Sequence, residues 1–166
     1  MFCISNSKKV QKLTHKSIRP LERADLVRVA FLVDVNEMFP SEMLPDMTAG
    51  HFAGEAQAHR WIVFDDGAVK AAAYYVPEPL TEGTWNVLMI AVDPAEHGRG
   101  IGSHLMRFIE QELAGEKVRV LLVETSGTPD FKRTRGFYDM LGYEREARIR
   151  EYYSAGDDKV IFRKAL

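Results

Sequence analysis

The sequence lacks the features of several protein classes. Its 166 residues contain one cysteine, Cys3, so a disulfide scaffold is excluded and the chain fits a reducing compartment. No apolar run approaches the roughly 18 residues that would span a membrane, and the first residues do not resemble a secretory signal. With 46% hydrophobic and 28% charged residues, the composition is typical of globular proteins. We therefore expect a single-domain cytoplasmic protein with no membrane partner.

The chain as a whole also has no large excess of one charge sign, because it contains 22 basic and 24 acidic residues. The signs are unevenly distributed, because residues 1–19 carry five basic side chains and no acidic one. A basic tail on an acidic body hints at nucleic-acid or membrane contact, but an acidic body does not favour a broad phosphate-binding face. We interpret residues 1–17 as a basic, flexible extension and residues 18–166 as the folded domain. We do not expect nucleic acid to be a partner.

Hydrophobic patterning predicts an α/β domain with a mixed sheet. The almost unbroken apolar run 84–92 predicts a central strand that is buried on both faces. The predicted strands are residues 17–19, 60–65, 68–76, 84–92, 118–124, 143–153 and 159–164. The predicted helices are residues 24–39, 41–59, 101–113 and 130–141.

A glycine-rich loop joins the central strand to an amphipathic helix. Gly98, Gly100 and Gly102 follow the Asp93-Pro94 stop, and glycine lets a backbone approach a ligand closely. The unpaired N–H groups and the dipole at a helix N-terminus favour an anion such as a pyrophosphate. Two rival motifs do not fit, since GxxxxGK[ST] is absent and Leu105 stands where the Rossmann pattern GxGxxG needs a third glycine.

This stretch resembles the coenzyme A loop of the GNAT superfamily of N-acetyltransferases, Gln/Arg-x-x-Gly-x-Gly/Ala. Here it reads His97-Gly98-Arg99-Gly100-Ile101-Gly102, after an apolar strand ending in Val92-Asp93-Pro94. A second family signature is an aromatic–tyrosine pair followed, three residues later, by glycine and an aromatic residue. It is matched by Phe137-Tyr138 and Gly142-Tyr143.

The resemblance covers about residues 18–166 and includes the element order. It implies a single-domain GNAT-like α/β (α+β) fold, with a central mixed, mostly antiparallel sheet of about six or seven strands and about four flanking helices. Two positions depart from the family pattern. His97 stands in place of the usual glutamine or arginine, and Phe131 stands where many members have an asparagine that contacts the pantetheine arm.

The resemblance further implies an acetyl-CoA-dependent transfer of an acetyl group directly to a primary amine of a small molecule or a protein. Backbone groups of Ala91 and Val92 would hold the pantetheine arm. The pyrophosphate would lie on the loop and the first helical turn, that is, on His97, Gly98, Arg99, Gly100, Ile101, Gly102 and Ser103.

Tyr138 occupies the family's general-acid position, so the resemblance implies that it protonates the departing thiolate. Residue type and spacing alone favour Tyr138 as a core aromatic on one face of a helix, and only the match to the family motif favours the catalytic role. An alkyl ammonium, with a pKa of about 10.4, must lose a proton before it can attack. Glu124, at the end of a buried strand, is the first candidate to bind or deprotonate the amine, and Glu78 and Glu82 are alternatives.

Other functions remain open at this stage. The five histidines show no metal-ligand spacing, so no metal is expected. Because a fold does not determine a function, a non-catalytic acyl-CoA-binding regulatory or partner module is the alternative to an enzyme. Tyr152 and Tyr153 either pack on a sheet or contact a substrate. The acceptor is not identified by the sequence, and a homodimer is left open.

Overall fold

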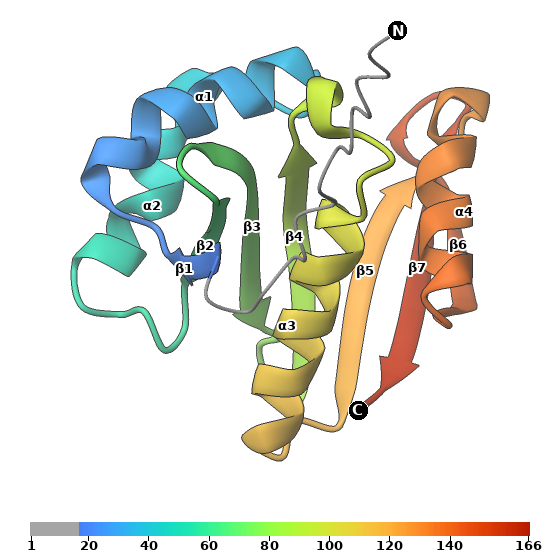
Figure 1. Cartoon of the computed structure of the whole chain (residues 1–166). Helices are drawn as coiled ribbons and strands as arrows, with labels where there is room; N and C mark the ends of the chain where they lie inside the picture. Colours follow the sequence, from blue (N-terminus) through green and yellow to red (C-terminus); the bar gives the residue numbers. More distant parts are fainter. Residues whose placement is uncertain (1–16) are drawn as a thin grey trace, which may run out of the picture.

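The computed structural model describes residues 17–166, which form one seven-stranded sheet with helices on both faces (Figure 1). The strands are β1 (Ile18–Pro20), β2 (Arg60–Asp65), β3 (Val69–Pro77), β4 (Thr84–Val92), β5 (Val120–Ser126), β6 (Glu144–Ser154) and β7 (Asp157–Ala165). The helices are α1 (Leu26–Val35), α2 (Leu44–Phe52), α3 (Ile101–Gly115) and α4 (Lys132–Met140). Apart from Ser17, the predicted basic extension lies outside the described residues.

The sheet has the order β1-β2-β3-β4-β5-β7-β6. Only β4 and β5 are parallel, and every other neighbouring pair is antiparallel. The expectation of a mixed, mostly antiparallel sheet with four flanking helices in a single domain is therefore confirmed. Within residues 17–166, no helix is long and apolar enough to cross a membrane.

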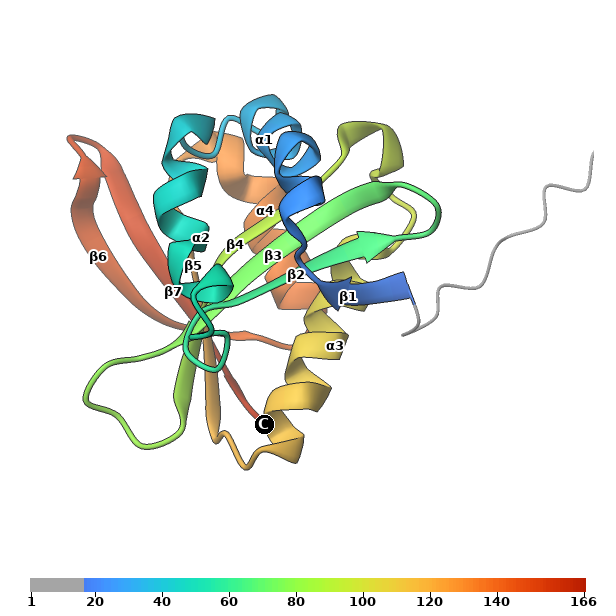
Figure 2. The ribbon, with the colours of Figure 1, turned by 90° about the vertical axis from the view of Figure 1, so that its left-hand side faces the viewer.

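Two hydrophobic cores lie on opposite faces of the sheet. Helices α3 and α4 cover one face, where Leu105, Ile109 and Tyr138 pack on side chains of the central strands. Helices α1 and α2 cover the other face, where Val29 and Leu32 pack in the same way (Figure 2). Because successive strand residues point to opposite faces, β4 contributes to both cores, which explains its almost continuous apolar run.

Some helix bounds differ from the sequence prediction. The helix predicted over residues 41–59 spans only Leu44–Phe52, and Gly54 then adopts a left-handed conformation with φ 91°. Similarly, α1 ends at Val35 rather than at residue 39, because Glu37 is left-handed with φ 50°. The helix predicted over residues 101–113 continues to Gly115, and Lys117 takes the left-handed position after it with φ 63°.

A bulge and a divergence give β4 its distinctive shape. Tyr74 faces Met89 while Tyr75 faces Val87, so Leu88 is an extra residue on β4. Its pairing with β5 stops at Val87, opposite Val123. Strand β5 nevertheless continues alongside β7. The two parallel strands therefore separate beyond the bulge, toward the end of the sheet at which α3 begins (Figure 1).

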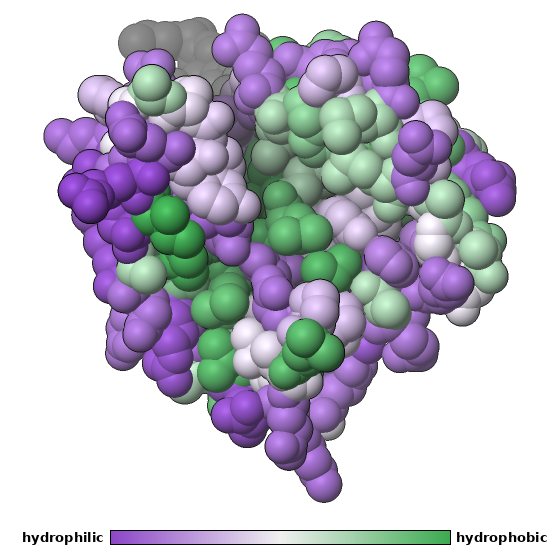
Figure 3. All heavy atoms as spheres, turned by 180° about the vertical axis from the view of Figure 1, so that it is seen from behind, coloured by the Kyte–Doolittle hydropathy of each residue, from purple (hydrophilic) through white to green (hydrophobic). Residues whose placement is uncertain are grey.

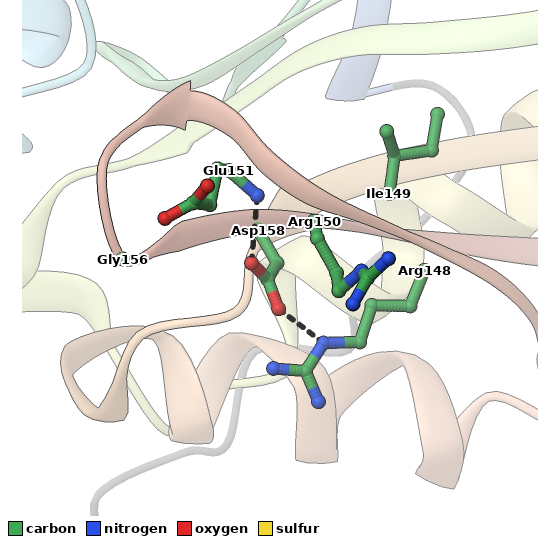
Figure 4. A pocket seen from close by; sticks show the side chains of 6 residues that line it. All are labelled: Arg148, Ile149, Arg150, Glu151, Gly156 and Asp158. Carbon is green, nitrogen blue, oxygen red and sulfur yellow. Dashed lines mark hydrogen bonds and ion pairs between the residues drawn. The ribbon is translucent and has the colours of Figure 1, made fainter.

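A second bulge bends the β6–β7 hairpin. Residues 150–153 of β6 lie between the pairs Ile149–Lys159 and Ser154–Asp157, so the ladder is interrupted there. The Asp158 side chain replaces the missing contacts by accepting the Glu151 N–H at 2.8 Å and the Arg148 Nε–H (Figure 4). These two hydrogen bonds lower the pKa of Asp158 below its usual value.

Asp158→Asn should lower the free energy of unfolding at neutral pH, because asparagine keeps an acceptor for Glu151 but loses the attraction to Arg148. The native pKa of Asp158 is lowered from an unfolded value of about 3.9. Its stabilisation is therefore fully present above that pH and is lost as the pH falls below it. Urea unfolding measured down to about pH 2.5 should show the difference between the two proteins shrinking. The exposed Asp130→Asn is the control, and a difference that is constant with pH would contradict this role.

Candidate active site

The diverging part of β4 offers backbone groups to the gap between β4 and β5. The Asp93 N–H donates to Lys70 O on the β3 side at 2.8 Å. The N–H and C=O groups of successive residues point to alternate sides of a strand. Those of Met89 and Ala91 therefore also point toward β3, while those of Ile90 and Val92 point toward β5. Of the two residues predicted for the pantetheine arm, Val92 therefore has this orientation and Ala91 does not. Ile90 has it and was missed.

The carbonyl oxygen of Val92 is already occupied. It accepts a hydrogen bond from Asn36 Nδ2 at 3.0 Å, and the His97 ring contacts it at 3.2 Å. His97 thus fastens the glycine-rich loop to the end of β4. The backbone groups left for a ligand on this part of β4 are accordingly the N–H of Val92 and both groups of Ile90.

The glycine-rich loop presents a group of amides without internal partners. The first hydrogen bond of α3 is donated by His104 to Gly100 O at 2.9 Å. Of the predicted loop residues 97–103, His97 donates its N–H to Pro94 O at 3.2 Å and Arg99 donates to Glu96 O at 3.3 Å. The other five N–H groups have no acceptor among residues 17–166. The free amides belong to Gly98, Gly100, Ile101, Gly102 and Ser103. This is a cradle for an anion at a helix N-terminus.

The three glycines have two different roles. Gly98 and Gly100 have φ of 79° and 81°, in the left-handed region that favours glycine, and a Cβ at Gly98 would meet nothing within 4 Å. At Gly102, a Cβ would come within 3.3 Å of the Phe137 ring and 3.6 Å of Val92. The first two glycines shape the cradle, while the third lets α4 and the end of β4 approach α3.

The side chains around the cradle are mostly exposed. The Arg99 guanidinium forms an ion pair with Glu96, and this glutamate also lies 3.4 Å from the ammonium group of Lys70. Phe131, which replaces the asparagine of many family members, is exposed at the start of α4. Its side chain offers no hydrogen bond at that position.

Tyr138 is buried against Phe137, Tyr143 and Phe162. Its hydroxyl nevertheless makes no hydrogen bond within residues 17–166. The other buried tyrosines do make one: Tyr74 bonds to His59, Tyr75 to Glu112 and Tyr143 to Glu110. Burial raises the pKa of Tyr138 above its ordinary value, so its hydroxyl stays protonated at neutral pH. The hydroxyl is not among the fully buried unpaired atoms of the described residues, so it is accessible to a ligand.

Two of the three candidate bases meet on the sheet face opposite α3. Asn86 Nδ2 donates to Glu78 Oε1 at 2.7 Å and to Glu124 Oε1 at 3.2 Å. Glu124 Oε2 also pairs with Lys159 Nζ at 2.6 Å. The third candidate, Glu82, is exposed, and its side chain takes no part in this cluster. Seen from this face, hydrophobic side chains line a hollow near the middle of the molecule (Figure 3).

Sequence reasoning missed Asn86, although a signal for it exists. It is the one amide within the apolar run of β4, and a polar residue inside a strand buried on both faces needs a partner. The Lys159–Glu124 ion pair left no such signal, because the two residues come from different strands and have no characteristic spacing.

The matches to known proteins agree with this geometry. The family model described as Acetyltransferase (GNAT) family matches residues 23–143. The chain belongs to the GNAT acetyltransferase family. It is therefore an acyltransferase, and the family's acyl donor is acetyl-CoA. No curated protein matches this sequence.

Several solved structures of the GNAT fold resemble the chain. A GNAT-family protein from Desulfovibrio desulfuricans is 28% identical, with a TM-score of 0.83 over 89% of this chain and 97% of that one. The ribosomal-protein-S18-alanine N-acetyltransferase of Escherichia coli is 20% identical, with a TM-score of 0.72 over 89% and 92% of the two chains. YncA of Salmonella typhimurium, solved with its cofactor acetyl-CoA, is 15% identical, with a TM-score of 0.71 over 90% and 92%.

Another hollow of the GNAT domain lies away from these residues. A groove of about 950 Å³ runs over the β6–β7 hairpin and is lined by Arg148, Ile149, Arg150, Glu151, Gly156 and Asp158 (Figure 4). It contains none of the predicted site residues. Its shape follows from the bulge that Asp158 supports, so we assign it to the architecture of the hairpin.

Gly100→Ala should weaken CoA binding. A side chain at φ 81° strains the backbone by roughly 1–2 kcal/mol, and relief of that strain would turn the cradle amides away from the anion. We expect about tenfold weaker binding, which removes about 1.4 kcal/mol of ligand-induced stabilisation at saturating CoA. Thermal unfolding with and without CoA measures this loss.

Gly115→Ala is the matched control, because it adds the same methyl group at the other end of α3 in open space. Its CoA-induced shift in Tm should equal that of the unaltered protein. An undiminished shift in the Gly100→Ala variant would contradict the placement of the anion on this loop.

Proposed function

We propose that the protein transfers an acetyl group from acetyl-CoA to a primary amine of a small molecule or protein, by direct attack of the amine and with Tyr138 as general acid. The observation that carries this proposal is Tyr138, whose ring is buried in the core while its hydroxyl makes no hydrogen bond in residues 17–166 and is not among the fully buried unpaired atoms. The residue follows directly on Phe137, which packs against Gly102 in the first turn of α3.

The free amides of the glycine-rich loop suit the pyrophosphate of the donor. Open space at Gly98 and unpaired N–H groups on Ile101, Gly102 and Ser103 leave room and donors for an anion. Arg99 lies beside them. The pantetheine arm then runs along Val92 and Ile90, which directs the thioester toward the bulge at Leu88.

The thioester chemistry makes two demands that this region can meet. The tetrahedral oxyanion needs a fixed donor, and a backbone N–H of the diverging part of β4 provides one. The departing thiolate needs a proton, and Tyr138 holds one at neutral pH because burial raises its pKa. General acid catalysis of this kind contributes about 10²–10⁴-fold to a rate.

The acceptor amine approaches from the opposite face of the sheet. Glu124 lies one residue beyond the last β4–β5 pair, and Glu78 shares its Asn86 contact. The two carboxylates and the Lys159 ammonium together carry a net negative charge, which attracts a cationic amine, and a carboxylate can take the proton that the amine must lose. Glu124 and Glu78 are the candidates that divide these two tasks.

Tyr138→Phe should lower kcat by about 100-fold or more and leave acetyl-CoA affinity within a few-fold, because only the proton donor is removed. Stopped or continuous assays of free thiol give kcat, and calorimetry gives the affinity. Tyr143→Phe is the matched control, since its hydroxyl bonds to Glu110 at 2.9 Å and should affect stability rather than turnover. Unchanged turnover in Tyr138→Phe would remove this residue from the mechanism.

Cationic alkylamines should be acetylated better than amines that carry a carboxylate. Thermal shifts with CoA, NAD and ATP come first, and only CoA should stabilise the protein. Amine acceptors are then screened with acetyl-CoA while free thiol is followed, and added salt should raise KM for the cationic acceptors by screening the carboxylates. Turnover of neutral or acidic acceptors alone would contradict a cationic acceptor. Stabilisation by CoA with no turnover of any amine would instead support a non-catalytic acyl-CoA-binding module.

A further inference from the structure

A chain of polar contacts crosses the sheet near the point where β4 and β5 separate. It begins at Glu78, passes through Asn86 to Glu124, and ends at Lys159. The Lys159 ammonium also lies 3.6 Å from the centre of the Tyr152 ring. These five residues come from the loop after β3 and from β4, β5, β7 and β6, so they span the face opposite α3.

Asn86 is the most buried member, with only 2% of its surface exposed. Its amide nitrogen donates a hydrogen bond to each carboxylate, while its Oδ1 is buried without a hydrogen-bond partner in residues 17–166. The reversed amide would place an oxygen against two carboxylates, so the nitrogen must face them. A buried amide that leaves one of its own groups unpaired to hold two acids is costly, which indicates a role for the paired acids.

The two carboxylates are not equivalent. Glu124 has the Lys159 ammonium at 2.6 Å, so its negative charge is already balanced. Glu78 pairs with no cation in residues 17–166, and its side chain accepts only from Asn86. Glu78 is therefore the carboxylate that has no cation to release before it takes a proton from the amine.

We propose that Asn86 is a positioning residue that holds Glu78 as the general base beside Glu124, so that the acceptor ammonium binds between two carboxylates. The inference rests on the acetyl transfer proposed above and assigns its acceptor side. The two carboxylates lie where β4 and β5 begin to separate, because Asn86 and Glu124 are the neighbours of Val87 and Val123, the last residues at which the two strands pair. The thioester, with the donor's arm on Ile90 and Val92, ends at the same point.

The proton and electron balance of the step is complete with these groups. The ammonium gives one proton to the Glu78 carboxylate, and the freed lone pair forms the C–N bond to the thioester carbon. The C–S bond then breaks, and its electron pair leaves on sulfur, which takes the proton of the Tyr138 hydroxyl. The second proton lost by the nitrogen restores the tyrosine, and Glu78 releases its proton to water.

Glu78→Gln against Glu82→Gln tests the assignment of the base. Both glutamates lie in the loop between β3 and β4, and both substitutions remove one negative charge. Glu78→Gln should lower kcat by about 100-fold and remove the acidic limb of the pH profile of kcat/KM, while Glu82→Gln should leave both unchanged. Equal behaviour of the two variants would overturn the assignment.

Asn86→Leu tests the positioning role, because leucine has a similar volume but no N–H donors. Glu78 then loses its one hydrogen-bond donor, and we expect the acidic limb of the pH profile of kcat/KM to move to higher pH. The other groups that face the pair, Glu124, Lys159 and Tyr152, are unchanged. We also expect at least tenfold weaker amine binding to the enzyme–CoA complex by calorimetry, with CoA affinity within twofold.

Asn86→Ser takes the place of the leucine variant if that variant does not fold, as judged by the CoA-induced shift in Tm. Adding Asn86→Leu to Glu78→Gln should cost little further activity, since both changes act on one unit. An unmoved acidic limb together with unweakened amine binding would overturn the inference while acetyl transfer stands. Absence of turnover in the unaltered protein with every amine would overturn the proposed function, and this inference with it.

Discussion

The separation of β4 from β5 is the constraint on which the site depends. Two parallel strands that stayed paired would use all the backbone groups between them, and a ligand could bind there only by replacing a ladder of hydrogen bonds. Here the ladder stops at Val87–Val123. The bulge at Leu88 turns β4 at that point, while β7 keeps β5 in place. Backbone groups of Ile90 and Val92 are thereby left open.

The same divergence gives the two faces of the sheet separate tasks. In the proposed reaction, the cradle amides and the Tyr138 hydroxyl on the α3 face hold the donor and protonate its leaving group. On the opposite face, Asn86 joins Glu78 to Glu124. A transfer between two ligands needs this separation, because an acid and a base in direct contact would neutralise each other instead of serving opposite ends of the reaction.

Much of this architecture could be predicted from the sequence, and the exceptions have physical reasons. The bounds of β2 and β4 follow from β-branched and apolar runs that end at turn residues, and the loop at residues 97–102 follows from its glycines. The Leu88 bulge could not be predicted, because one more apolar residue in an apolar run carries no signal. The Ala91 assignment depended on which way each backbone group turns, and only the register with β3 decides that. The pairing of Glu124 with Lys159 depends on strand order, which spacing along the chain does not reveal.

Amide hydrogen exchange on β4 tests the central claim most directly. Measured by NMR with and without CoA, the exchange of the Ile90 and Val92 amides should slow markedly on binding, together with the free amides of residues 98–103. The Met89 and Ala91 amides, which pair toward β3 already, should change little. Unaltered exchange at Ile90 and Val92 in the CoA-saturated protein would contradict the placement of the donor between the diverging strands.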